Sequence, residues 1–224
     1  MPKDYYQNIL YPLQDNILRH LENIDTSFYL TGGTALSRAY LQHRYSDNLD
    51  FFANNNDLFK EEVQKIIDFL KAQGYTIEIP TTDVSFVRLF VNTKQAVLKI
   101  DFVNDVSFRK GIPVKTTLFY KTDIVENILS NKLTALSRFA SKDIADIVFI
   151  CLNYKFEWEK IIADAAQKDM WINPIESVKI LESFPLDNLH EINWVVSPDI
   201  KKFRFQLNTI IRDILEGKEN TLYV

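Results

Sequence analysis

The sequence predicts an α+β fold, with a mixed β-sheet flanked by helices and followed by a C-terminal helical region. Segments rich in β-branched and aromatic residues concentrate in the first half of the chain. From Thr122 onward, apolar residues instead recur at helical spacing. Because the pattern changes near residue 115, we expect an α/β core over residues 1–115 and a helical region over residues 116–224.

Composition and charge are those of an ordinary soluble chain. The 224 residues are 46% hydrophobic and 25% charged, with only five glycines and seven prolines, so most of the chain should fold. The single cysteine, Cys151, excludes an intramolecular disulfide and a cysteine-based zinc cluster, and its apolar neighbours predict a buried thiol. Neither a signal core nor a membrane span is evident, so we expect a cytoplasmic protein without a membrane partner.

The first half alternates predicted helices and strands. Apolar spacing predicts a helix over residues 5–21, with Pro12 as a place where it can kink. A short strand over residues 27–31 runs into the Gly32-Gly33 turn, and good helix formers follow directly over residues 34–41. The remaining elements are strands over residues 48–52, 75–79, 85–92 and 96–103, and a helix that Asp57 caps and Gly74 ends.

The sequence pattern of the second half predicts helices throughout. Asn173-Pro174 and Ser197-Pro198 each fit a capping residue followed by proline at the first helical position. The predicted helices span residues 123–139, 141–153, 157–170, 174–184 and 198–216.

A double-glycine turn follows the first predicted strand. Gly32 and Gly33 allow backbone N–H groups to approach a phosphate, and a helix that begins at Thr34 adds its positive end. The same residues also suit an ordinary tight turn, and they match neither a P-loop nor a GxGxxG fingerprint. The turn alone therefore leaves both interpretations open.

An acidic segment coincides with the second predicted strand. Strand alternation places Asn48 and Asp50 on one face and Asp47 on the other, and oxygen ligands at this spacing can bracket magnesium ions. The alternative is that Asp50 caps a turn while Arg44 makes a surface ion pair.

A carboxylate also interrupts the apolar strand over residues 97–103. A charge among core neighbours is costly unless it is paired or bound to a metal, which makes Asp101 a candidate functional residue. Its alternation with Lys99 would instead place both side chains on a solvated face.

Charged residues recur on the helices that follow. Lys132 has no acidic residue at i+4, which leaves its ammonium free to reach a phosphate. Asp143 and Asp146 are three positions apart and share one helix face. The alternative is an ordinary charged helix surface.

The net charge of −4 gives no global attraction to nucleic acid. Two short basic clusters, Arg109-Lys110 with Lys115 and Lys201-Lys202-Phe203-Arg204, are typical of solvated faces. Nucleic-acid binding through the second cluster is an alternative function.

Taken together, the four polar segments resemble the nucleotidyltransferase family of AbiEii/AbiGii toxins, within the DNA-polymerase-β-like superfamily. That family has a GG-T/S turn, R-x-S-x-D-L-D-F, L-K-x-D/E-F, and K-L-x-A-L-x-x-R followed by R/K-D-x-x-D. The corresponding residues are 32–34, 44–51, 98–102 and 132–146, and the resemblance spans about residues 28–150.

The resemblance implies magnesium-dependent transfer of a nucleoside monophosphate from an NTP to an RNA, such as tRNA, or to a protein. It further implies the toxin of a toxin–antitoxin pair, with a cognate antitoxin protein as partner, and a helical region that completes the site. Asp50 and Asp101 would hold magnesium, Lys132 would neutralise the triphosphate, and Arg44 would position the carboxylate strand. The other implied nucleotide-binding residues are Gly32, Gly33, Thr34, Asp143 and Asp146, the last two orienting Lys132 or contacting the nucleotide.

One position departs from the family pattern. Asn48 stands where the family has the first aspartate of D-x-D, and it can offer an amide oxygen but no charge. Either Asp47 substitutes through a local bulge, or the site works with fewer charges, or the protein binds nucleotide without efficient transfer.

Overall fold

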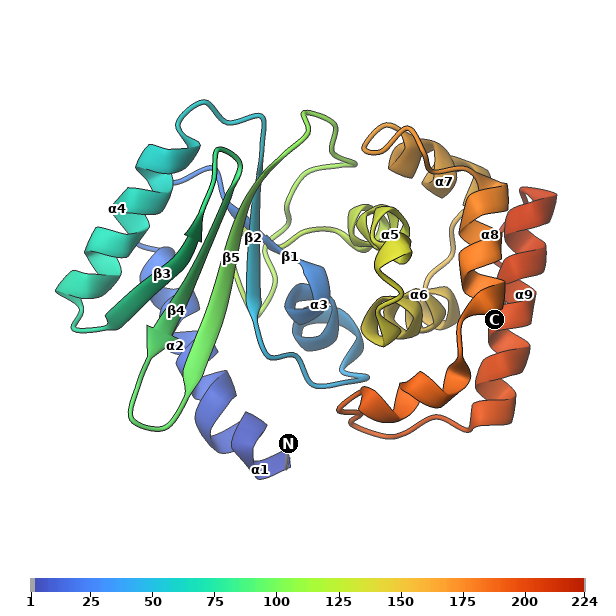
Figure 1. The fold of residues 1–224 in the computed structure, drawn as a ribbon, viewed down its shortest axis with the longest axis horizontal. Helices are drawn as coiled ribbons and strands as arrows, with labels where there is room; N and C mark the ends of the chain where they lie inside the picture. Colours follow the sequence, from blue (N-terminus) through green and yellow to red (C-terminus); the bar gives the residue numbers. More distant parts are fainter. Residues whose placement is uncertain (1–2, 224) are drawn as a thin grey trace. The chain divides into compact units, whose positions relative to one another are not determined.

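The computed structural model describes residues 3–223. Contacts divide the chain into two compact units. The sheet belongs to the first unit and helices α5 to α9 belong to the second (Figure 1). The first unit comprises Met1–Ala39, Tyr45–Ser107 and Pro113–Asp123, and the second comprises Tyr40–Arg44, Phe108–Ile112 and Ile124–Val224.

Five strands form one mixed sheet in the order β1-β2-β5-β4-β3. The central pair, β2 and β5, is parallel, and the other neighbouring strands are antiparallel. The predicted α+β class with a mixed, helix-flanked sheet is therefore confirmed. The strands are β1 (Tyr29–Thr31), β2 (Leu49–Asn54), β3 (Thr76–Thr82), β4 (Phe86–Asn92) and β5 (Val97–Asp105).

The two faces of the sheet differ because apolar and polar residues alternate along its central strands. On β2, the buried positions are Leu49, Phe51 and Ala53, and the residues between them are partly exposed. Helices α2 (Tyr11–Leu21) and α4 (Phe59–Ala72) cover the apolar face (Figure 1). Five buried aromatic rings pack against one another in this core, with Phe51 and Phe102 stacked and the other pairs edge-to-face: Phe28, Phe59, Phe102, Phe51 and Phe119.

The N-terminal helix has three parts, because α1 (Lys3–Tyr5) continues through a π-helical turn over Tyr6–Leu10 into α2. The wider π pattern falls just before Pro12, which has no N–H to donate to the helix. The helix geometry therefore changes beside Pro12, the position at which the sequence allows a kink.

Two predicted helix starts are wrong. The N-cap of α4 is Leu58 rather than Asp57. The backbone N–H of Leu58 donates a 2.9 Å hydrogen bond to Asn56 Oδ1. The last helix is capped by Asp199, whose carboxylate accepts the Lys202 N–H, so it begins after Pro198. The prediction at Asn173 is confirmed, since its side chain accepts the Glu176 N–H.

The second unit is built mainly of α-helices, with 3-10 turns over Leu136–Arg138 and Leu186–Glu191. Helix α5 packs against α6 and α7, and α9 packs against α6, α7 and α8. Cys151 is fully buried as predicted, and burial raises the pKa of its thiol well above the usual value. None of the helices in residues 3–223 has both the length and the apolar character of a membrane span. The helices are α5 (Val125–Thr134), α6 (Ser141–Asn153), α7 (Trp158–Ala166), α8 (Pro174–Ser183) and α9 (Ile200–Glu216).

Candidate functional site

A row of polar residues crosses the face of the sheet opposite the apolar core. In the strand register, Asp50 pairs with Thr31 on one side and with Asp101 on the other. Asp101 pairs in turn with Arg88, and Arg88 with Thr81. Residues that pair directly across neighbouring strands point to the same face, so the two carboxylates lie side by side. The structure therefore brings together Asp50 and Asp101, which are far apart in the sequence.

Asp101 is 7% exposed and lies in an ion-pair cluster. Arg88 binds it with two parallel hydrogen bonds, Nε to Oδ1 at 2.8 Å and Nη2 to Oδ2 at 2.9 Å. Lys99 Nζ lies 3.2 Å from Oδ2. Burial alone would raise the pKa of Asp101, but Arg88 and Lys99 outweigh it and lower the pKa below the usual value. Asp101 is thus paired rather than solvated, and Arg88 is a site residue that the sequence did not reveal.

The glycine turn lies against Asp50. Gly32 has φ +69°, and a Cβ placed on it would lie 2.7 Å from Asp50 Oδ2, so only glycine leaves room for that carboxylate. The chain continues as α3 (Gly32–Thr34) and a π-helical segment over Ala35–Leu41. The buried Thr34 hydroxyl is bonded to Ser46 Oγ at 2.8 Å and to the Asn48 carbonyl oxygen. The Thr34 side chain therefore serves inside the unit.

The two carboxylates suit a hard divalent cation. Magnesium ions are commonly held by one or two carboxylates, with water and substrate phosphates as the remaining ligands. Asp50 and Asp101 meet that description, and the absence of a side chain at Gly32 lets the Asp50 carboxylate pack against the glycine turn. No group of three or more His, Cys, Asp or Glu side chains that could hold a metal occurs in the described part of the chain.

The segment before β2 differs from the expectation. Strand β2 begins at Leu49, so Asn48 and Asp47 precede it and strand alternation does not determine where they point. The Tyr6 hydroxyl donates a 2.6 Å hydrogen bond to Asp47 Oδ1. Asp47 is therefore engaged with the N-terminal helix.

In the second unit, Asp146 is the centre of a buried ion network. Arg44 binds it with two hydrogen bonds of 2.7 Å, from Nε to Oδ1 and from Nη2 to Oδ2. His43 Nε2 lies 2.8 Å from Oδ1, and Lys132 Nζ lies 2.6 Å from Oδ2. The same ammonium lies 2.6 Å from Asp143 Oδ1. Arg44, Lys132, Asp143 and Asp146, four of the predicted site residues, thus form one cluster.

Two expectations about this cluster are wrong. Lys132 is not free, because its acidic partners lie eleven and fourteen positions further along the chain, on the next helix. The charges are not a helix surface either, since Arg44 is 3% exposed and Asp143 and Asp146 are buried. Burial without pairing would be costly, so each carboxylate has at least one cation beside it.

Pairing controls the protonation of the network. Burial would raise the pKa of Asp146, but Arg44 and Lys132 lower it well below the usual range. Burial likewise opposes the charge on Lys132, yet Asp146 and Asp143 raise its pKa. For His43 burial dominates and lowers the pKa, so the ring is neutral at pH 7, and its Nδ1 has no hydrogen-bond partner in the described residues.

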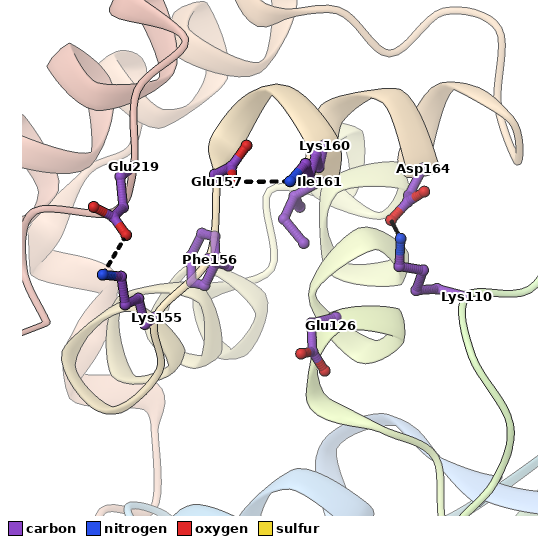
Figure 2. Close-up of a pocket in the computed structure, with 9 residues that line it drawn as sticks. All are labelled: Lys110, Glu126, Lys155, Phe156, Glu157, Lys160, Ile161, Asp164 and Glu219. Carbon is purple, nitrogen blue, oxygen red and sulfur yellow. Dashed lines mark hydrogen bonds and ion pairs between the residues drawn. The ribbon is translucent and has the colours of Figure 1, made fainter.

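Two residues of the predicted basic clusters, Phe203 and Lys110, have structural roles. Phe203 is 0% exposed, so it cannot stack on a base, which removes the aromatic part of the second cluster. Lys110 belongs to the second unit, where it lines a pocket of about 290 Å³ and pairs with Asp164 at 3.2 Å. Figure 2 shows two further pairs there, Lys155 with Glu219 and Lys160 with Glu157. The Lys110 ammonium is therefore paired with a carboxylate of its own unit.

The contact between Gly32 and Asp50 can be tested by replacing glycine with alanine. Gly32→Ala and the control Gly74→Ala both put alanine at positive φ, which costs about 1–2 kcal/mol of unfolding free energy. Gly74 has no atoms within 4 Å of its added Cβ, whereas Gly32 would clash with Asp50, adding about 1–3 kcal/mol. Urea denaturation measures both, and equal losses would contradict the close approach.

The network around Asp146 predicts a large cost for removing its central charge. Asp146→Asn should lower the free energy of unfolding by about 3–5 kcal/mol, because Arg44 and Lys132 would remain buried without it. Glu157→Gln, which removes an exposed pair with Lys160, is the matched control and should change little. Equal effects in urea denaturation would show that the network contributes no special stability.

His43 predicts a pH dependence of stability. Its folded pKa lies below the unfolded value near 6.5, so the unfolded state binds the proton more readily and stability is lost as pH falls below 6.5. His43→Gln, which keeps a donor for Asp146, should flatten the fall in unfolding free energy between about pH 7.5 and 5.5. An unchanged slope would show that His43 does not titrate differently in the folded state.

The chain is similar to one described protein family and to solved structures. The family model described as nucleotidyl transferase AbiEii toxin, type IV TA system, matches residues 16–206. A search of curated proteins gives no match. Among solved structures, a candidate nucleotidyltransferase from H. pylori is similar with a TM-score of 0.66 and 20% identity, over 96% of each chain. JHP933 from Helicobacter pylori is similar with a TM-score of 0.62 and 19% identity, over 96% of this chain and 94% of that one. These two similarities show that the fold is shared. Since the family model covers most of the sequence, the chain belongs to the nucleotidyl transferase AbiEii toxin family.

Proposed function

We propose that the protein transfers a nucleoside monophosphate from an NTP to a hydroxyl group of an RNA, such as tRNA, or of a protein. In this reaction the acceptor oxygen bonds to the α-phosphorus, the bond from the α-phosphorus to the bridging oxygen breaks, and pyrophosphate leaves with the electron pair. The acceptor proton passes to a base or to solvent. The observation that carries the proposal is the pairing of Asp50 with Asp101 beside the side-chain-free Gly32.

Asp50 and Asp101 would hold the magnesium ions. Bound magnesium would neutralise phosphate charge and favour attack at the α-phosphorus. The backbone of Gly32, Gly33 and Thr34 would contact the phosphates, a role for which N–H groups at a glycine turn are suited. The Thr34 hydroxyl is excluded from that role because it is already bonded within the unit.

For the second unit, we propose that the Lys132 ammonium contacts the triphosphate. An ammonium has three donors, and the carboxylates of Asp143 and Asp146 engage two of them. Those carboxylates would hold the ammonium in one position, while Arg44 and His43 fix Asp146. This assigns Asp143 and Asp146 to orienting Lys132.

The family description supports a biological role as the toxin of a toxin–antitoxin system. The proposed partners are an NTP, an RNA or protein acceptor and a cognate antitoxin protein, and the proposed location is the cytoplasm. Modifying an RNA or protein needed for growth would account for toxicity.

Asp50 provides the direct test of transfer. Asp50→Asn preserves size but removes a metal-binding charge, so transfer of label from α-³²P-NTPs to cellular RNA or protein should fall by about 100-fold or more. Asp68→Asn on α4 is the control, because it removes the same charge from an exposed helix position of the same unit. Loss of transfer in both variants, or in neither, would contradict the assigned role of Asp50.

Asn48 favours a second candidate, a member of this fold that binds nucleotide without transferring it. The position offers an amide in place of a carboxylate, and the described residues contain no third acidic group at the pair. This candidate predicts that wild-type protein binds NTPs without turnover and that Asn48→Asp gains transfer. Robust turnover by the wild type would reject it.

A further inference from the structure

Arg88 occupies the carboxylate to which the proposed function assigns a metal. Its guanidinium covers both oxygens of Asp101, and Lys99 adds a contact to one of them. A fork-to-fork pair of this kind uses the lone pairs that would otherwise face a cation. A divalent ion that binds Asp101 must therefore share the carboxylate with Arg88 or displace it.

The surroundings of Arg88 allow displacement. The Arg88 side chain is 36% exposed, whereas the carboxylate it binds is nearly buried. Asp101 accepts two hydrogen bonds from this guanidinium, and the guanidinium carbon also lies 5.3 Å from the centre of the Phe86 ring. Asp50 also attracts the guanidinium electrostatically, so both carboxylates act on one arginine. Arg88 thus neutralises the pair from a position that remains open to solvent.

We propose that Arg88 competes with a divalent cation for Asp101 and, once displaced, binds the phosphates of the incoming nucleotide. The inference rests on the proposed function. It adds Arg88 to the proposed site and places the binding of the divalent cation before the contact between Arg88 and the phosphates. Arginine suits both positions, because its planar fork matches carboxylate and phosphate alike. The same positive charge therefore covers Asp101 before the metal arrives and faces the triphosphate afterwards.

The first measurement is the affinity for Mn²⁺ without nucleotide, by electron paramagnetic resonance. Arg88→Met removes the competitor and should tighten Mn²⁺ binding by about tenfold, with Arg88→Lys in between because lysine cannot form the fork. Arg19→Met removes the same charge from α2 and should leave the affinity unchanged. Asp101→Asn should weaken binding in either background, which locates the ion.

The second measurement is the affinity for inorganic triphosphate at saturating Mn²⁺, by calorimetry. Here Arg88→Met should weaken binding by about fivefold or more, because a phosphate contact is lost. Tighter Mn²⁺ binding together with weaker triphosphate binding is the discriminating result. If Arg88 were merely structural, its loss would weaken the binding of both ligands. Thermal melts of all variants show whether each protein is folded.

Three results would overturn the inference. Mn²⁺ binding by Arg88→Met that equals that of the wild type, or is weaker, would show that Arg88 does not compete with the ion. In that case, loss of Mn²⁺ binding in Asp50→Asn would still support the metal site. Unchanged triphosphate affinity would remove the phosphate role. If neither the wild type nor Arg88→Met binds Mn²⁺, both the competition by Arg88 and the assignment of the metal to Asp50 and Asp101 are wrong. The transfer of labelled nucleotide tests the proposed function separately.

Discussion

The parallel pairing of β2 with β5 places two carboxylates side by side on one face of the sheet. Like charges at paired positions repel, so Asp50 and Asp101 require a cation between or beside them. Arg88 and Lys99 supply positive charge from the neighbouring positions. The same requirement makes the pair a suitable place for magnesium, because an ion of higher charge satisfies both carboxylates at once. Stability of the sheet and the proposed chemistry therefore depend on one electrostatic constraint.

The second unit solves a similar problem in a different way. Asp146 is fully buried, and three side chains, Arg44, His43 and Lys132, surround its two oxygens. Neutral His43 adds a hydrogen bond to Asp146 without adding a charge. Such a network has one well-satisfied arrangement, so it fixes the position of the Lys132 ammonium. A fixed ammonium is better prepared to meet a phosphate than a mobile one.

Local sequence patterns are sufficient to predict the strands and the change to helices. They are also sufficient to identify Asp101 as a candidate functional residue. Burial of a charge in an apolar strand is visible in the sequence, because its neighbours are consecutive residues. The partner of that charge is not visible, since Arg88 reaches Asp101 only through the register of two antiparallel strands. Lys132 shows the same limit, because its partners lie beyond the end of its own helix. Asn48 was misplaced for a simpler reason, namely that β2 begins one residue later than expected.

The proposed function depends on Asp50 and Asp101 binding a divalent cation together. The most direct measurement is a crystal structure of the protein grown with Mn²⁺ and a non-hydrolysable NTP, with an anomalous difference map calculated at the manganese edge. We expect an anomalous peak in contact with both carboxylates, with the Arg88 guanidinium moved from Asp101 to the phosphates. Nucleotide bound with no anomalous peak at Asp50 and Asp101, or with manganese held elsewhere, would contradict it.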